Sequence, residues 1–122
     1  MVVTVEVPTY PLNKHILTAK VLYRVDGVSV DAGGSWTSDV VDISMFYLKT
    51  VTIVCDYGMK VRIEVSDDLT NWDTYYETTV EANKLYSFWF RELYMYLCVT
   101  VENPDTSNPH NIVRLRVKGR VM

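Results

Sequence analysis

Residues 61–76 read Val61-Arg62-Ile63-Glu64-Val65-Ser66-Asp67-Asp68-Leu69-Thr70-Asn71-Trp72-Asp73-Thr74-Tyr75-Tyr76. Apolar and polar residues alternate from Val61 to Val65, the period of two expected of a strand with one buried and one solvated face. Ser66-Asp67-Asp68 supplies short side chains that bond nearby amides and tolerate turn dihedrals. Trp72 is placed to fold its indole over the turn. The stretch predicts two strands and a tight turn at the corner of a β-sandwich, with structural roles for Ser66, Asp67, Asp68 and Trp72.

The length and composition favour one all-β domain. A chain of 122 residues is long enough to bury about two-thirds of its unfolded surface without staples. Hydrophobic residues make up 48% of the chain, and many are β-branched or aromatic. We therefore expect a single domain over residues 1–122.

The formal net charge of −3 gives no attractive field for nucleic acid or for an anionic membrane. No apolar run is long enough to span a bilayer, and the first residues lack the basic and apolar regions of a signal peptide. We expect a protein without a membrane span, an export signal or a nucleic-acid partner.

The N-terminal residues carry a strand pattern, because valines at positions 3, 5 and 7 alternate with polar residues before Pro8. Residues 1–14 are therefore expected to form either an edge strand or an extended arm. The arm would pack on its own domain or on a neighbour.

Strand patterns recur along the rest of the chain at short, regular spacing. Val25-Asp26-Gly27-Val28 predicts a hairpin with a type I′ turn, and Gly33-Gly34 predicts a loop. Further strands are expected over residues 36–43, 47–55, 85–90, 94–101 and 113–119. In the last of these, Val113, Leu115 and Val117 should face the core. About eight to ten strands indicate an antiparallel, jelly-roll-like β-sandwich.

The second half of the chain resembles discoidin-like domains, the jelly-roll modules also found as coagulation-factor C-type domains. The resemblance lies in Val65-Ser66-Asp67-Asp68-Leu69-Thr70-Asn71-Trp72, in residues 93–101 and in the closing strand 113–119, and it covers roughly residues 39–119. A similar signature recurs in small β-sandwich structural proteins of tailed phages and other viruses. Two features differ from discoidin-type binding modules, because this chain is shorter in the first half and has its cysteines within strands. The resemblance implies a fold more than a function.

Residues able to perform catalysis or bind a metal do not form a recognisable set. Cys55 and Cys98 fall within apolar strand patterns and are expected to be buried free thiols, with a disulfide as the alternative. His15 and His110 belong to no nucleophile or metal motif, and with the cysteines they lack the paired spacing of a zinc site. Asp67 and Asp68 are expected to be turn residues rather than calcium ligands. We therefore expect no enzyme activity, cofactor or metal.

Two groups of side chains are candidates for recognition. The aromatic residues of positions 86–96 either fill the core or an interface, which we favour, or stack on sugars. These aromatic residues are Tyr86, Phe88, Trp89, Phe90, Tyr94 and Tyr96. The basic row Arg114, Arg116, Lys118 and Arg120, extended by Lys60 and Arg62, is expected to form a cationic face on adjacent strands. That face is either simply solvated or paired with acidic residues of a neighbouring subunit, for which Asp39, Asp42, Asp67 and Asp68 are candidates.

These observations favour a non-enzymatic virion structural protein, such as a head decoration, turret, fibre or tail-associated component. It would act by forming a homo-oligomer or by docking to other virion proteins. The alternative function is a small carbohydrate-binding module with a glycan partner, and the alternative location is the cytoplasm.

Overall fold

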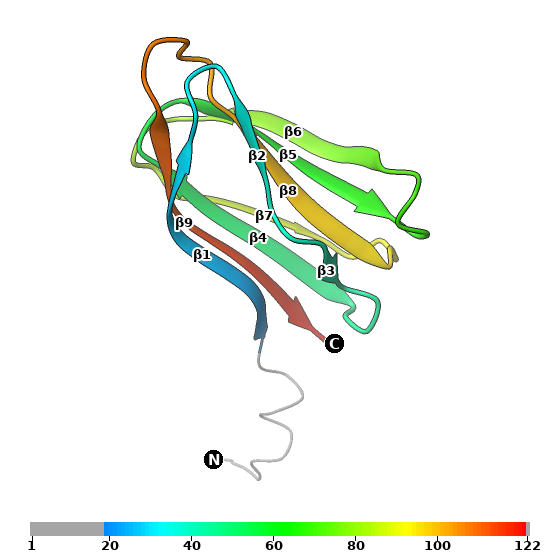
Figure 1. Ribbon diagram of the computed structural model, residues 1–122. Coiled ribbons are helices and arrows are strands. Elements are labelled where there is room, and N and C mark those ends of the chain that lie inside the picture. The colour runs from blue at the N-terminus through cyan, green and yellow to red at the C-terminus, as the bar shows by residue number, and fades with distance from the viewer. Residues whose placement is uncertain (1–18, 122) are drawn as a thin grey trace, which may run out of the picture.

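The computed structural model describes residues 19–121 and contains nine β-strands (Figure 1). The strands are β1 (Lys20–Val30), β2 (Ser35–Thr37), β3 (Val41–Asp42), β4 (Leu48–Cys55), β5 (Met59–Ser66), β6 (Asp73–Val80), β7 (Tyr86–Phe90), β8 (Tyr96–Glu102) and β9 (His110–Arg120). The expected strand or arm over residues 1–14, and with it His15, lies outside the described residues. No helix among residues 19–121 is long and apolar enough to cross a membrane.

The strands form two antiparallel sheets that pack face to face (Figure 1). Sheet A has the order β1-β9-β4-β7, and sheet B has the order β2-β8-β5-β6, with β3 also paired to β8. The predicted antiparallel β-sandwich is therefore confirmed for the described residues. The two ends of the described chain lie side by side, because Lys20 pairs with Gly119 across β1 and β9.

The core forms where the apolar positions of both sheets face each other. Alternate residues of β5 (Val61, Ile63, Val65) are buried, as the period of two predicted. Strand β8 is covered on both sides, because every residue from Leu97 to Val101 is buried. Hydrophobic burial of this kind is the main favourable contribution to folding.

Lys49 is a polar member of this interior. It lies in phase with Val51 and Ile53 on β4, and its side chain is fully buried at the end of the core. The ammonium group donates hydrogen bonds to the carbonyl oxygens of Phe46 (3.3 Å), Tyr47 (3.2 Å) and Glu92 (2.7 Å). Desolvation lowers the pKa of Lys49, opposed by the charge of Glu92. The lysine therefore joins two loops at one end of the sandwich.

The hairpin predicted at Asp26-Gly27 is wrong. Both residues lie inside β1, which continues to Val30 beside β9. Gly27 has a φ of +68°. Opposite this glycine, β9 has one extra residue relative to its other neighbour, β4. Val54 of β4 pairs with Arg114, whereas the next residue, Cys55, pairs with Ile112. The positive φ of Gly27 thus accompanies a β-bulge in the neighbouring strand rather than a chain reversal.

The same bulge overturns the predicted orientation of Val113. That side chain is 36% exposed, whereas Ile112 is fully buried and takes its place beside Leu115 and Val117. A bulge shifts the alternation of a strand by one residue, so side chains on either side of it can face the core at both odd and even positions.

The strand expected over residues 36–43 is two short strands, β2 and β3, which both pair with β8. Between them, Ser38 is buried and bonds the backbone of Val99 in both directions, through its amide and its hydroxyl. This connection replaces the ladder of a single continuous strand.

Candidate functional site

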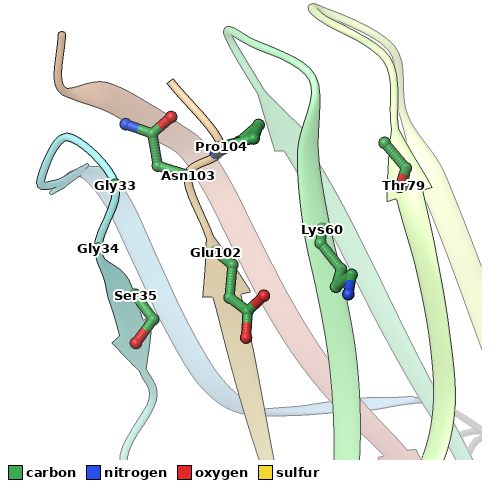
Figure 2. A pocket seen from close by; sticks show the side chains of 8 residues that line it. All are labelled: Gly33, Gly34, Ser35, Lys60, Thr79, Glu102, Asn103 and Pro104. Atoms are coloured by element: carbon green, nitrogen blue, oxygen red, sulfur yellow. The ribbon is translucent and has the colours of Figure 1, made fainter. Parts of the chain in front are cut away.

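A polar pocket of about 530 Å³ lies on the outer face of sheet B, where the strands meet the loops (Figure 2). Four of its side chains form one cross-strand row, since Ser35 pairs with Glu102, Glu102 with Lys60, and Lys60 with Thr79. Gly33, Gly34, Asn103 and Pro104 complete the lining. We call this the sheet B pocket.

The two charged side chains that line the sheet B pocket, Lys60 and Glu102, form ion pairs with residues outside the pocket. The Glu102 carboxylate accepts a hydrogen bond from Arg62, which also lies 3.7 Å from Glu64. The Lys60 ammonium lies 3.1 Å from a carboxylate oxygen of Glu77. These ion pairs are partly exposed and add little stability, but they restrict where the two charges can point.

A chain of hydrogen bonds continues from this row along the same face. Thr100 donates to Glu64 (3.0 Å), and the hydroxyls of Thr37 and Thr100 lie 3.1 Å apart. Thr100 is buried although it points away from the core, because the long side chains of β5 cover it. The outer face of sheet B is therefore an ordered polar layer.

The rim of the pocket is fixed by Asn103, whose side chain is almost fully buried. Its amide donates to the carbonyl oxygens of Val30 (3.2 Å), Asp31 (3.3 Å) and Asn108 (2.9 Å). The Gly33 amide donates to the Asp105 carbonyl oxygen at 2.8 Å. The loops that follow β1 and β8 are thus tied to each other and to the end of β1.

The predicted basic row lies on the outer face of sheet A. Arg114, Arg116, Lys118 and Arg120 alternate along β9 with buried Leu115, Val117 and Gly119, and Arg24 extends the row onto β1. We call these five cations the basic face. Its one acidic neighbour on these strands is Asp26, which accepts hydrogen bonds from Arg116 (2.9 Å) and Arg24 (3.3 Å). Both arginines lower the pKa of Asp26, with Arg116 having the larger effect.

Lys60 and Arg62 do not belong to the basic face. They lie on β5 in sheet B, on the opposite outer surface of the sandwich, and they pair with acidic residues there. The prediction that they continue the row on adjacent strands is wrong, because β9 is flanked by β1 and β4.

Charge is divided between the two sheets. The outward-facing positions of the sheet A strands carry Asp26 as their one acidic residue, against the cations Lys20, Arg24, Arg114, Arg116, Lys118 and Arg120, whereas Lys49 is buried in the core. The strands of sheet B carry Lys60 and Arg62 against Asp42, Glu64, Asp73, Glu77 and Glu102. The sandwich therefore has a basic side and an acidic side although its net charge is small.

Most of the aromatic candidates pack on the core, as we favoured. Phe90 is buried, and Tyr86, Phe88 and Tyr94 are partly buried against the core residues. Tyr96 is half-buried at the start of β8. Trp89 is the exception, because it points outward from β7 in the same cross-strand row as Thr50 and Lys118 and is 60% exposed. The guanidinium of Arg91 lies 5.0 Å from its ring centroid.

The turn after β5 is held by hydrogen bonds from its own side chains. The Asp68 carboxylate accepts the amides of Thr70 (2.9 Å) and Asn71 (2.8 Å), and these bonds hold its pKa well below its usual range. The Ser66 hydroxyl accepts the amide of Leu69, and Asp67 accepts that of Met95. Trp72 covers the turn and donates its indole N–H to the Leu69 carbonyl oxygen at 3.3 Å. Asp39, which precedes β3, and Asp42, the last residue of β3, are both exposed.

The predicted buried free thiols are confirmed. Cys55 faces the core, where burial raises its pKa to about 12. Cys98 faces the outer layer of sheet B beside Glu64, and burial raises its pKa to about 11.

His110 stacks on Tyr57 with ring centroids 3.8 Å apart and forms a hydrogen bond with Asp105 at 2.8 Å. No group of three His, Cys, Asp or Glu residues within 19–121 has the arrangement of a metal site.

No family model matches the sequence, and no curated protein matches it. The structure is similar to the crystal structure of the PBSX exported protein XepA (18% identity, TM-score 0.66), covering 93% of this chain and 39% of that chain. It is also similar to PirA (8% identity, TM-score 0.54), covering 80% and 94% of the two chains. A further similar structure is the carbohydrate-binding module TmCBM61 in complex with β-1,4-galactotriose, at 16% identity, a TM-score of 0.49, and 75% and 68% coverage.

The chain therefore spans about two-fifths of the length of XepA. At 18% and 8% identity, the similarities to XepA and PirA show the fold alone. The resemblance to discoidin-like domains is supported at the level of the β-sandwich.

Proposed function

We propose that this chain is a non-enzymatic β-sandwich module of a phage-type particle, which assembles by docking its basic face on an acidic surface of a neighbouring subunit. The observation that carries the proposal is the division of charge between the two sheets. A basic face and an acidic side on one molecule complement each other across a head-to-tail contact, which closes into a ring or extends into an array.

Two further features support the proposal. Trp89 is an exposed aromatic residue beside the basic face, and tryptophan and arginine are the residues that most often dominate binding energy in interfaces. The similarity to an exported protein of PBSX supports a phage setting. The proposal includes a location in a virion or another phage-encoded particle, with copies of the chain or other particle proteins as partners.

The test is sedimentation velocity of the whole chain at low and high salt. The variant carries Arg114→Ser and Lys118→Ser, because Arg116 is engaged with Asp26 and the backbone of β1. A matched pair of single variants compares Lys118→Ser with the control Lys84→Ser, which removes the same charge from a turn outside both sheets. We expect self-association that weakens with salt, and a variant with weaker, less salt-dependent association than the control.

Two results would contradict the proposal. One is a wild-type protein that stays monomeric at high concentration and binds no component of a purified particle. The other is equal weakening by Lys118→Ser and Lys84→Ser, which would assign the effect to net charge rather than to the basic face.

A further inference from the structure

We propose that residues 3–7 of a neighbouring copy add a strand to the free edge of β7, so that sheet A of one copy continues into the next copy. This goes beyond the contact proposed for the basic face, because it uses the edge of sheet A rather than its outer face. The two contacts share only the premise, taken from the proposed function, that copies of the chain associate.

Strand β7 is the least protected edge of the sandwich. It ends sheet A, and within residues 19–121 it pairs with β4 alone. Edge strands are commonly protected from further pairing by charged residues, by bulges or by being very short. The edge strands β1 and β6 carry charged residues and pair through a register shift, and β2 and β3 have three and two residues. The five residues of β7 contain no charge and no register shift, so β7 is the edge best able to accept another strand.

An apolar groove beside β7 provides space for the side chains of an added strand. It has a volume of about 260 Å³ and lies between β7 and β6, the last strand of sheet B. Its lining includes the buried core residue Ile63. It also includes Phe88 and the half-exposed Tyr76, whose ring centroids lie 5.0 Å apart. Side chains that point inward from a strand next to β7 would enter this groove and extend the core.

The sequence of residues 3–7, Val-Thr-Val-Glu-Val, has the same length and alternation as β7. In β7, the aromatic residues at 86, 88 and 90 pack on the core, and those between them are exposed. A strand added in this phase places its three valines against the aromatic rings, and aromatic residues opposite β-branched residues stabilise paired strands.

The polar positions of residues 3–7 also fit the outer side of β7. In the same phase, Thr4 and Glu6 lie on the outer face beside Ser87 and Trp89. The Arg91 guanidinium lies 5.0 Å from the Trp89 ring centroid, and none of the ion pairs within residues 19–121 involves it. Arg91 can therefore pair with Glu6 of the added strand.

The chain is long enough to deliver residues 3–7 to another copy. Residues 8–19 precede Lys20, the first residue of β1, and twelve extended residues span up to about 40 Å. The β7 strand of the same copy lies at the opposite edge of sheet A, three strand spacings or about 14 Å from β1. Pro8 and Pro11 restrict φ to extended values, which favours a connection that reaches a neighbour over one that folds back across its own sheet.

The test is disulfide crosslinking between two whole-chain variants that are mixed before mild oxidation. One copy carries Ser87→Cys, at an exposed position of β7, and the other carries Thr4→Cys, Glu6→Cys or Val5→Cys. Because side chains alternate along a strand, we expect Thr4→Cys or Glu6→Cys to give at least about ten times the interchain yield of Val5→Cys. Oxidation of the wild type, whose two cysteines are buried, measures the background.

A second pair of variants tests the backbone pairing. Val5→Pro removes a backbone donor and should lower the crosslinking yield roughly tenfold or more, whereas Asn13→Pro makes the same change outside residues 3–7 and should not. Equal yields from Thr4→Cys, Val5→Cys and Glu6→Cys, no interchain crosslink, or equal effects of the two prolines would overturn the proposal.

The same experiment separates strand addition from docking of the basic face. High salt should weaken the basic-face contact and leave the crosslinking yield largely unchanged, because backbone hydrogen bonds and apolar contacts hold the added strand. Salt-dependent association without the crosslink would refute strand addition alone. The crosslink without any effect of Lys118→Ser would refute docking of the basic face alone.

Discussion

Lys49→Met should destabilise the fold strongly although methionine has nearly the same length as lysine. The substitution keeps an unbranched side chain against Phe90, over whose ring the ammonium lies at 5.1 Å. It removes the donor to three carbonyl oxygens, those of Phe46, Tyr47 and Glu92. The bond to Glu92 is the shortest, at 2.7 Å, and it is the one that joins the two loops.

The magnitude follows from the number of bonds and from what replaces them. A buried polar group left without a partner costs about 1–3 kcal/mol, so three carbonyls set an upper limit of about 9 kcal/mol. Two effects reduce this cost. Loops at the end of the sandwich can readmit water, and the variant no longer has to desolvate a charge. We expect a net loss of about 3 kcal/mol, or about 10–15 °C in Tm for a domain of this size.

Thermal and urea unfolding followed by circular dichroism measure this loss. The control is Lys84→Met, an exposed substitution expected to change the free energy of unfolding by no more than about 0.5 kcal/mol. A Lys49→Met protein that melts within about 2 °C of this control would refute the reasoning, because the three bonds would then contribute nothing beyond those that water supplies.

Three other perturbations test the remaining sites. Trp72→Ala should lower the free energy of unfolding by about 1–2 kcal/mol, since the indole is half-buried, and chemical denaturation measures it; lost partner binding with unchanged stability would instead make it a recognition residue. Cys55 and Cys98 should resist a thiol reagent at pH 8 until the chain is unfolded, because burial keeps both thiols protonated, and fast labelling of the native protein would contradict this. Asp105 has its pKa lowered to about 2, chiefly by its hydrogen bond with His110, so the unfolded chain binds its proton more readily. Its stabilising effect should be complete above its unfolded pKa of about 4 and lost toward pH 2, and Asp105→Asn should flatten the fall of Tm over this range relative to Asp39→Asn.

The sequence allowed the sandwich to be predicted because the deciding signals are local. Alternation over Val61–Val65 and the short polar side chains of Ser66–Asp68 depend only on neighbours in the chain, and the structure keeps both. The continuous apolar run of β8 likewise indicated a strand covered on both faces.

The sequence could not reveal features that depend on distant partners. A glycine with positive φ fits a type I′ turn and a bulge equally well, and β9, far along the chain, decides for Gly27. The split between the basic face and Lys60 with Arg62 depends on which strands share a sheet. Lys49 did carry a local signal, because it is in phase with Val51 and Ile53, but its acceptors lie in loops that only the fold brings together.

The pairing of β1 with β9 has a mechanical consequence. The strands are antiparallel neighbours, and their paired ends Lys20 and Gly119 lie at the same end of the ladder that runs to Val30 and His110. A force that pulls residues 20 and 120 apart would break these hydrogen bonds one pair after another, in the unzipping geometry. It would not load them all together, as in the shear geometry. The β1–β9 pairing is therefore weak against tension applied between residues 20 and 120.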